Sequence, residues 1–205
     1  MIIGFDAKRI VRNNTGLGSY SRNLVNDLSS VLDSGTEMRL YAPDEGNEAL
    51  RRQVRETAFM KFVYPDSCNF RLTRDLWRIK GIVDDLKRDK VDLFHGLTGE
   101  LPMGIKKAGI KSVVTIHDLI FMHHPEYYNW LDTKIYAWKF HQTCKEADRI
   151  IVMEGGRIAQ IGTHDELLKT SEIYRETFTS QNKMTEEAQA PALNAADKEG
   201  GEVHE

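Results

Sequence analysis

The sequence predicts an α/β protein with a single parallel sheet and helices on both of its faces. Two features predict this fold. Short runs rich in β-branched and apolar residues alternate along the chain with stretches in which apolar residues recur every three to four positions. The run from Ser112 to His117 is apolar over most of its length, as in a strand buried on both faces. With 205 residues, 40% of them hydrophobic, the chain is long enough for one sizeable domain.

In the first third of the chain we expect strands at residues 2–7, 38–43 and 59–64. A polar loop from Lys8 to Gly18 follows the first strand. It leads into a helix with apolar residues at 3–4 spacing along one face, namely Leu17, Tyr20, Leu24, Leu28 and Val31. The charged stretch 48–56 predicts a short surface helix before the third strand.

The middle of the chain continues the alternation. An amphipathic helix is predicted by the spacing of its apolar residues Leu72, Leu76, Ile79, Val83 and Leu86. Strands are expected at 91–95, 112–117 and 149–153, with a connector at 97–111 and an aromatic-rich helix at about 128–147.

After Met153 the pattern changes. Two glycines, Gly155 and Gly156, separate apolar runs and predict a β-hairpin whose second strand is 158–161. Thr163 with Glu166 three residues later is a capping-box pattern, which predicts a short helix, and a second helix is expected around 173–178. The stretch 182–205 has almost no large apolar residue and a charge of −4 from six acids and two lysines, so we expect it to be disordered.

The ends of two predicted strands carry side chains that can do chemistry. In open α/β sheets, ligands bind beyond the carboxyl ends of the strands. His117 and Asp118 end one strand and are the candidate catalytic residues, and His95 ends the neighbouring strand as a candidate substrate-binding residue. A histidine can exchange protons near neutral pH. The alternative is that these are ordinary polar residues at the rim of the sheet.

The loop before the first long helix offers a second candidate site at Gly16, Leu17 and Gly18. Glycines let a ligand approach the backbone, and free N–H groups at a helix start favour a phosphate. The pattern is neither the GxGxxG fingerprint nor a P-loop, which would need Gly-Lys followed by Ser or Thr. A simple helix-entry turn is the alternative.

Composition excludes several classes of function. The net charge of −3 and the absence of a basic stripe argue against nucleic acid as a partner. The spacing of His123, His124 and His141 fits no standard metal site, and Cys68 and Cys144 suggest lone buried thiols. The N-terminus lacks the pattern of a signal peptide and no apolar run approaches membrane-spanning length, so we expect a cytoplasmic location.

Residues 1–151 resemble the N-terminal, Rossmann-like domain of family 4 glycosyltransferases of the GT-B type. The matching stretches follow one another in family order: IGFDA at 3–7, TGLGSYSR at 15–22, FHGLTGELP at 94–102, VVTIHDLIF at 113–121, HPEYY at 124–128 and CKEADRII at 144–151.

This resemblance implies a retaining transferase that moves a sugar from a nucleotide-sugar donor to a glycan or lipid-linked acceptor, often in polysaccharide synthesis. It implies that the loop at Gly16–Gly18 approaches the donor phosphates and that His117 lies by the reacting sugar. It implies no cofactor and no metal. Contact with a membrane surface is left open.

Residues 147–183 resemble the last segment of an ABC-transporter ATP-binding domain, through ADRIIVMEGGRIAQIGTHDELL at 147–168. None of the ATP-binding motifs of that family is present. The two resemblances meet at 147–151, which suggests a chimera joined across this shared stretch. We therefore expect a transferase domain at 1–151, a transporter-like fragment at 152–181 and an acidic tail at 182–205.

The function that these patterns predict is a truncated glycosyltransferase-like protein. A GT-B enzyme holds most of its donor in a second domain, which we expect to be missing, so we expect little activity from this chain alone. The residues leave open whether the chain is an enzyme. The alternatives are a transport component, which is given little weight because only a non-catalytic segment matches, and a binding module without catalysis. The donor sugar and the acceptor are not specified.

Overall fold

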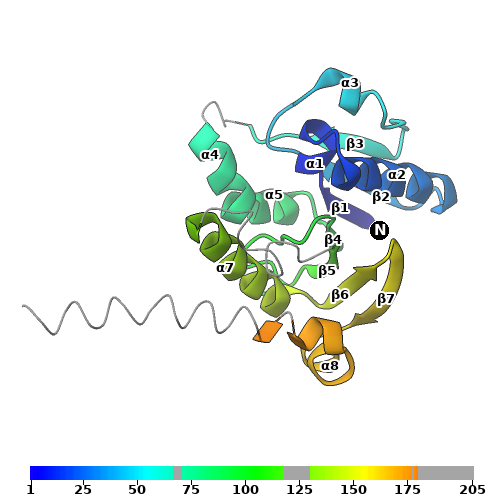
Figure 1. The fold of residues 1–205 in the computed structure, drawn as a ribbon. Helices are drawn as coiled ribbons and strands as arrows, with labels where there is room; N and C mark the ends of the chain where they lie inside the picture. The colour runs from blue at the N-terminus through cyan, green and yellow to red at the C-terminus, as the bar shows by residue number, and fades with distance from the viewer. Residues whose placement is uncertain (67–70, 118–129, 177, 180–205) are drawn as a thin grey trace, which may run out of the picture.

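The structure is a computed structural model that describes residues 1–66, 71–117, 130–176 and 178–179 (Figure 1). Residues 182–205, which we expect to be disordered, lie outside the described residues. The candidate catalytic residue Asp118 also lies outside them. Both stay predictions.

The described strands form one sheet in the order β3-β2-β1-β4-β5-β6-β7. The first six strands pair in parallel, and β7 pairs antiparallel with β6 at the edge. The strands are β1 (Ile2–Asp6), β2 (Glu37–Tyr41), β3 (Met60–Val63), β4 (Leu93–Gly96), β5 (Lys111–Ile116), β6 (Arg149–Glu154) and β7 (Arg157–Gly162). This is the doubly wound order in which consecutive strands spread outward from a central pair, β1 and β4.

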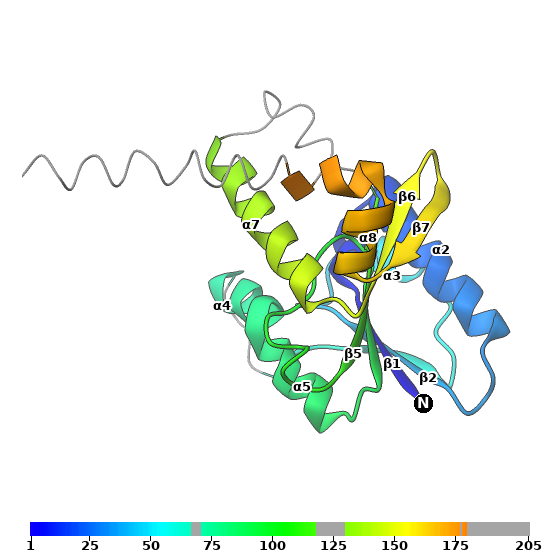
Figure 2. The ribbon, with the colours of Figure 1, turned by 90° about the horizontal axis from the view of Figure 1, so that it is seen from below.

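Helices cover both faces of the sheet, which confirms the predicted fold class. The helices are α1 (Lys8–Arg12), α2 (Gly16–Val31), α3 (Glu48–Arg51), α4 (Arg71–Leu76), the π-helical η1 (Trp77–Gly81), α5 (Ile82–Arg88), α7 (Trp130–Glu146) and α8 (His164–Thr170). Seen from below, α2 lies on one side of the sheet and α4, α5 and α7 lie on the other (Figure 2). None of the described helices is long and apolar enough to cross a bilayer.

Three buried clusters form the core, because a parallel sheet must bury both faces. One lies between β1–β3 and the helices α1 and α2 and includes Phe5, Ile10 and Val25. The second packs α5 and η1 on the other face of the sheet. The third joins β5 and β6 to α7 and to the C-terminal helical segment, through Phe140 and Leu167.

The predicted polar loop from Lys8 to Gly18 is wrong in its first half, because residues 8–12 form the helix α1. Ile10 and Val11 are fully buried in the first core cluster. Two adjacent apolar residues in a charged stretch are too few for periodicity to show, so burial decides the structure here.

The apolar face predicted for α2 is also only partly correct. Leu24 and Leu28 pack against the first cluster, but Val31 is 76% exposed. The fully buried positions of α2 include Ser21, Arg22 and Val25. The helix is therefore turned so that a polar stripe is buried, and the guanidinium of Arg22 contacts the loop that precedes the helix.

The predicted helix around 72–86 exists, but a π-turn at its centre shifts the buried face. The π-turn η1 inserts an extra residue between α4 and α5. As a result Trp77 is buried and Leu76 is 57% exposed, so the prediction was wrong for Leu76. Val83 and Leu86 are buried as predicted. The surface helix predicted at 48–56 is shorter than expected and ends at Arg51.

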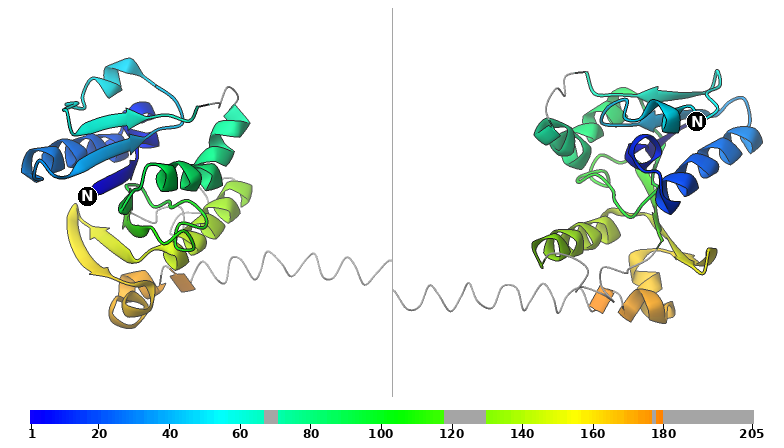
Figure 3. Two further views of the ribbon diagram at one scale, coloured as in Figure 1. Left: turned by 180° about the vertical axis from the view of Figure 1, so that it is seen from behind. Right: turned by 45° about the horizontal axis from the view of Figure 1, so that its top comes forward.

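The C-terminal hairpin has the predicted form. Gly155 and Gly156 both have positive φ, 54° and 75°, as a two-residue type I′ turn requires. Thr163 and Glu166 make the predicted capping box at the start of α8. The hairpin and α8 lie at the end of the sheet opposite to β3 (Figure 3). The second strand of the hairpin, β7, is added to the sheet as an antiparallel edge strand beside β6.

The edge strand β7 contains a bulge. Ile161 pairs with Ile151 and Gln160 with Val152, but Met153 pairs with Ile158, so Ala159 is an extra residue without a partner on β6. Ile158 and Ile161 are each 58% exposed.

The segment after α8 is helical at 172–176 and 178–179, as predicted. Tyr174 and Phe178 join α8 and α7 in the third core cluster. Cys144 lies there too, as a buried free thiol whose pKa burial raises to about 12. The predicted state of this cysteine is confirmed, and Cys68 lies outside the described residues.

Candidate functional site

The loop before α2 is shaped by the side chain of Asn13. Its Oδ1 accepts hydrogen bonds from the backbone N–H groups of Thr15, at 2.9 Å, and Gly18, at 3.1 Å. It also accepts from the Thr15 hydroxyl at 2.7 Å. The Asn13 side chain thus already accepts a hydrogen bond from one of the backbone amides at the start of α2 that we predicted to be free for a ligand. Within the described part of the chain, no acceptor lies against the amides of Gly16 and Leu17, which remain for a ligand.

The two glycines of this loop differ in what surrounds them. A Cβ on Gly18 would lie 1.8 Å from the Asn13 carbonyl oxygen and 2.9 Å from Nη1 of Arg22. A Cβ on Gly16 would meet nothing within 4 Å. Gly18 is therefore required by the fold of the loop. Gly16 keeps open the space in front of the two unpartnered amides.

Arg22 stabilises the loop before α2 by hydrogen bonds to backbone carbonyl groups. It is 2% exposed, and its Nη1 donates to the carbonyl oxygens of Ile10, at 3.0 Å, and Asn13, at 2.8 Å. Burial lowers its pKa. None of the described carboxylates forms an ion pair with it, so a buried positive charge lies beneath the loop without a balancing anion. Sequence reasoning gave Arg22 no role, because a polar residue on a predicted helix is normally exposed.

The two candidate histidines lie on adjacent strands, as predicted, but in different surroundings. His95 forms a 2.8 Å hydrogen bond between its Nε2 and Oγ1 of Thr115, a fully buried residue. Burial and the proximity of His117 lower the pKa of His95 to about 4. His95 is thus uncharged near neutral pH, and it contributes to this edge of the sheet through its hydrogen bond to Thr115.

His117 directly follows β5 and is half-buried. Its Nε2 donates to the carbonyl oxygen of Leu97 at 2.8 Å, which leaves Nδ1 for another partner. The ring of Tyr20 meets the imidazole edge-on, with centroids 4.3 Å apart. The Tyr20 hydroxyl also donates to Thr115 at 3.3 Å. Tyr20, on the second turn of α2, thereby connects the Gly16 loop to both histidines.

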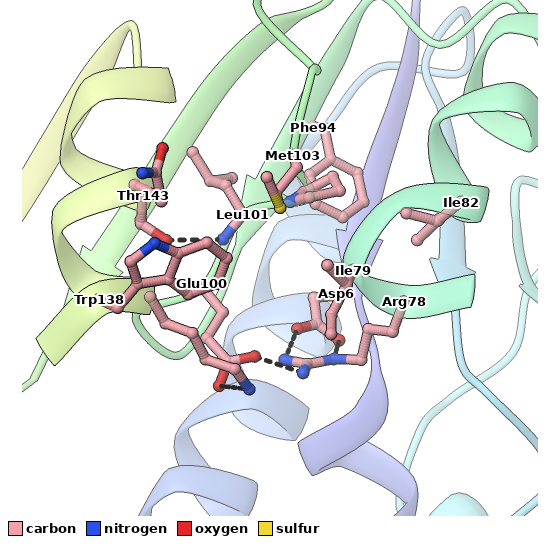
Figure 4. A pocket seen from close by; sticks show the side chains of 13 residues that line it. Asp6, Arg78, Ile79, Ile82, Phe94, Glu100, Leu101, Met103, Trp138 and Thr143 are labelled. Atoms are coloured by element: carbon pink, nitrogen blue, oxygen red, sulfur yellow. Dashed lines mark hydrogen bonds and ion pairs between the residues drawn. The ribbon is translucent and has the colours of Figure 1, made fainter. Parts of the chain in front are cut away.

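A second polar group lies at the same edge of the sheet, on its other face. Arg78 from η1 donates to the Asp6 carboxylate at the end of β1, with Nη2 2.7 Å from Oδ2. It also pairs with Glu100, whose other oxygen lies 3.6 Å from Nζ of Lys139 (Figure 4). Arg78 is 9% exposed and Asp6 7% exposed at the side chain, so the two charges neutralise each other largely out of water.

The electrostatics of this cluster follow from its geometry. Burial alone would raise the pKa of Glu100, but Arg78, Lys139 and Lys8 outweigh it and lower the pKa to about 2. Burial would lower the pKa of Arg78, and Asp6 and Glu100 raise it instead. Burial and Arg78 lower the pKa of Lys8.

The sequence interpretation missed Asp6, Arg78 and Glu100. Asp6 ends a strand just as His117 does, so the same rule would have identified it. Arg78 gave no signal, because only the π-turn brings it to the sheet.

The described residues contain no group of three or more His, Cys, Asp or Glu side chains that could hold a metal ion. The candidate site at the carboxyl ends of the parallel strands thus consists of amide donors, imidazoles and buried ion pairs. Such groups can bind an anion and a hydroxyl-bearing ligand.

The strand order and the rim place this protein in the Rossmann-like class, with the architecture of one half of a GT-B fold. A model of the family described as Glycosyltransferase Family 4 matches residues 14–154, more than half of the chain. The chain belongs to this family.

Shorter matches relate part of the chain to transport ATP-binding proteins. The chain is 58% identical over 40 residues to the subtilin transport ATP-binding protein SpaT of Bacillus subtilis, which is 20% of this chain and 6% of that protein. It is 52% identical over 40 residues to the putative multidrug export ATP-binding/permease protein YgaD of Bacillus subtilis, 20% of this chain and 7% of that protein.

A longer match, 40% identical over 69 residues, is to the mycobactin import ATP-binding/permease protein IrtA of Mycolicibacterium smegmatis. It covers 34% of this chain and 7% of that protein. The chain thus spans only a small fraction of these relatives. Both resemblances found in the sequence are confirmed.

Proposed function

We propose that this chain forms one wall of a sugar-transfer cleft and binds the diphosphate of a nucleotide-sugar at the start of α2. The observation that carries the proposal is the pair of unpartnered amides at Gly16 and Leu17, above the buried and unbalanced charge of Arg22. Backbone amides at the N-terminus of a 16-residue helix attract anions through hydrogen bonds and through the helix dipole. The cation beneath them adds to the attraction.

His117 is the residue that we propose acts beside the sugar. Tyr20 links it to the phosphate loop, and its Nδ1 is the ring nitrogen that Leu97 does not occupy. We assign it a role in positioning the reacting sugar or the acceptor hydroxyl. His95 supports this arrangement through its hydrogen bond to Thr115, and its lowered pKa of about 4 leaves it uncharged at neutral pH. The catalytic role predicted for Asp118 stays a prediction.

A polypeptide of these 205 residues should transfer little sugar by itself. Transfer requires that donor and acceptor are held in register and that developing charge is stabilised from both sides. The described residues supply one α/β unit, with one helix N-terminus facing the proposed diphosphate. The chimeric origin and the domain limits 1–151, 152–181 and 182–205 belong to this proposal, as does the choice of a glycan or lipid-linked acceptor.

Titration with UDP and GDP, followed by calorimetry or ligand-observed NMR, tests the donor site. Gly16→Val should weaken nucleotide binding by roughly tenfold or more, because the new side chain fills the space in front of the amides and costs about 1.5–3 kcal/mol per lost charge-assisted hydrogen bond.

Gly35→Val is the matched control, since a Cβ at Gly35 meets only Oδ1 of Asp33 at an ordinary 3.5 Å. Equal affinity for the wild type and Gly16→Val would contradict the site, and so would the absence of any nucleotide binding. Robust transfer from a UDP- or GDP-sugar by the purified chain would contradict the expected inactivity.

A further inference from the structure

A hollow of about 670 Å³ lies where the parallel strands begin, at the edge of the sheet opposite to the candidate site. The first residues of β4, β5 and β6, which are Leu93, Lys111 and Arg149, line it. Lys145 at the end of α7 and His164 at the start of α8 also line it. We call this space the junction hollow, because α8 lies beyond the stretch 14–154 that the family 4 model matches. Its volume is within the range of small-molecule binding sites.

Four basic side chains line the junction hollow, and they have few partners within the protein. Among the described residues, no carboxylate forms an ion pair with the ammonium of Lys111 or Lys145. Nζ of Lys106 lies 3.4 Å from the carbonyl oxygen of Lys145. Nη1 of Arg149 lies 4.0 Å from the nearest carboxylate oxygen, Oε2 of Glu166. All four cations therefore retain hydrogen-bonding capacity for an anion from outside.

The carboxylates around the junction hollow do not cancel this positive charge. Only two of the described lining residues, Asp148 and Asp165, are acidic. Oδ2 of Asp148 accepts hydrogen bonds from the backbone N–H of Ser112 at 2.9 Å and from its hydroxyl at 3.4 Å. Glu166, beside the hollow, accepts from the backbone N–H of Thr163 at 2.8 Å. Two of the nearby acids are thus occupied by backbone groups that position the strand and the helix.

The start of α8 and the end of α7 face the same space. His164 on α8 is half-buried, and its Nδ1 lies 2.8 Å from the Tyr174 hydroxyl, which leaves Nε2 for another partner. Burial lowers the pKa of His164, Asp165 raises it, and Lys145 on α7 lowers it. Lys145 and Asp165 are therefore close enough to act on one imidazole. One side of the hollow thus belongs to the parallel sheet and α7, and the other side to the C-terminal segment.

The lining favours a small ligand with several negative charges and no aromatic ring. Lysine ammonium groups bind phosphate groups well, as compact charges that need no fixed orientation. Cations that come from separate parts of the chain are best neutralised by a ligand with two separated anionic groups. None of the described lining residues is Phe, Tyr or Trp, so a nucleobase would find no ring to stack on. An apolar ligand would take the cations out of water without pairing them.

We infer that the junction hollow binds a small, non-aromatic ligand that carries two phosphate groups, of the class of the sugar bisphosphates. Lys111, Lys145 and Arg149 would hold it from the side of the parallel sheet, and the start of α8 would contact it from the other side. Bound ligand would therefore also hold α8 against the sheet. The inference does not rest on the proposed donor site, which lies at the opposite edge and shares no residue with the hollow.

An NMR titration of the full, ¹⁵N-labelled chain with fructose 1,6-bisphosphate tests the inference. The amides at 111–113, 145–149 and 163–165 should shift together and saturate at millimolar concentrations or below. Binding should weaken as salt is added, because the attraction is between charges near water. Glucose 6-phosphate, with one phosphate group, should bind more weakly by roughly fivefold. The same titration of Gly16→Val, which blocks the proposed donor site, should give the same shifts.

Substitutions that change one charge sharpen the test. Lys111→Gln and Lys145→Gln should each weaken binding roughly three- to fivefold, and the double variant by roughly tenfold or more. Asp165→Asn should tighten binding roughly twofold, because it removes a negative charge that lines the hollow. Lys61→Gln is the matched control, since Lys61 is exposed on β3, at the other end of the sheet, and its loss changes the net charge equally.

Four outcomes would overturn the inference. They are the absence of saturable binding, shifts confined to 15–18, equal affinity for the two sugar phosphates, and equal weakening by Lys61→Gln and Lys145→Gln. Shifts confined to 15–18 would place the ligand at the proposed donor site instead. Binding at 111–113 and 163–165 by a chain that fails to bind UDP would refute the donor site and support the junction hollow.

Discussion

Strands β5 and β7 belong to one sheet but are buried in contrasting ways. In β5 only Lys111 is exposed, and four of its six residues are buried. In β7 only Gly162 is buried and four residues are exposed. β5 runs parallel between two neighbouring strands, whereas β7 is an antiparallel edge strand. The parallel strands therefore depend on helices on both faces, while β7 depends on one strand and one helix.

This contrast matters for function because the candidate sites sit on the parallel part. His95 is the last residue but one of β4, His117 directly follows β5, and Asp6 ends β1. The C-terminal hairpin is joined to that part by β6 and by the third core cluster, where Leu167 and Tyr174 meet Phe140. The rim should therefore keep its geometry when the hairpin opens, and the following predictions test that separation.

The largest effect is expected at the ion-pair cluster beneath the rim. Arg78→Met should lower the free energy of unfolding by about 3–5 kcal/mol, because it would leave the Asp6 and Glu100 carboxylates buried without their shared cation. Urea unfolding measures the change. Arg52→Met is the control, because Arg52 and its partner Glu48 are both largely exposed, and it should change little. A loss below about 1 kcal/mol in Arg78→Met would show that water reaches and solvates the two carboxylates.

A smaller and local effect is expected where α8 docks. Leu167 is 1% exposed, and Leu167→Ala should cost about 2–4 kcal/mol of packing in the third core cluster. If the hairpin opens separately, amide exchange should accelerate across 157–170 and stay unchanged across 111–116. Ile161→Ala, at a side chain that is 58% exposed, should change little. Equal acceleration in both segments would mean that the whole sheet unfolds as one unit.

The smallest of these effects is a pH dependence carried by His95. Its pKa in the fold, about 4, lies below its unfolded value of about 6.5, so the unfolded chain binds the proton first. The contribution of His95 to stability is complete above pH 6.5 and is lost as the pH falls toward 4. Between pH 7 and pH 5 the loss should be about 2 kcal/mol.

His95→Gln should flatten the pH profile by this amount, because glutamine does not titrate and can still hydrogen bond to Thr115. Unfolding free energies of both proteins at pH 7, 6 and 5 measure the difference. The pKa values of His141 and His164 are also lowered, but they contribute equally to both proteins and cancel. Parallel profiles for the two proteins would contradict the assignment to His95.

The sequence predicted the sheet well, because strand burial leaves a direct mark on it. The strands from Ile2 to Met153 and the hairpin at Gly155 were found from apolar runs and turn residues. The placement of the two histidines at adjacent strand ends followed from the same rule.

The buried faces of the helices and the residues of the site were harder to predict, because the local sequence pattern does not show what a buried polar group contacts. Arg22 is buried because it hydrogen bonds to two carbonyl groups that the chain supplies nine and twelve residues earlier. Arg78 reaches Asp6 only because a π-turn shifts the helix that carries it. A 3.6-residue periodicity predicts neither the carbonyl partners of Arg22 nor the Asp6 partner of Arg78.

The unpaired Ala159 has a consequence for how the end of the chain is aligned. The turn at Gly155 and Gly156 sets the pairing of Met153 with Ile158, and the docking of α8 behind Gly162 sets the pairing of Ile151 with Ile161. These two alignments disagree by one residue, and the strand absorbs the mismatch at Ala159. Because paired residues share a face, Ile158 and Ile161 both project to the side of Ile151 and Met153, away from α8. The turn and α8 each keep their preferred geometry because Ala159, which lies between them, has no partner on β6.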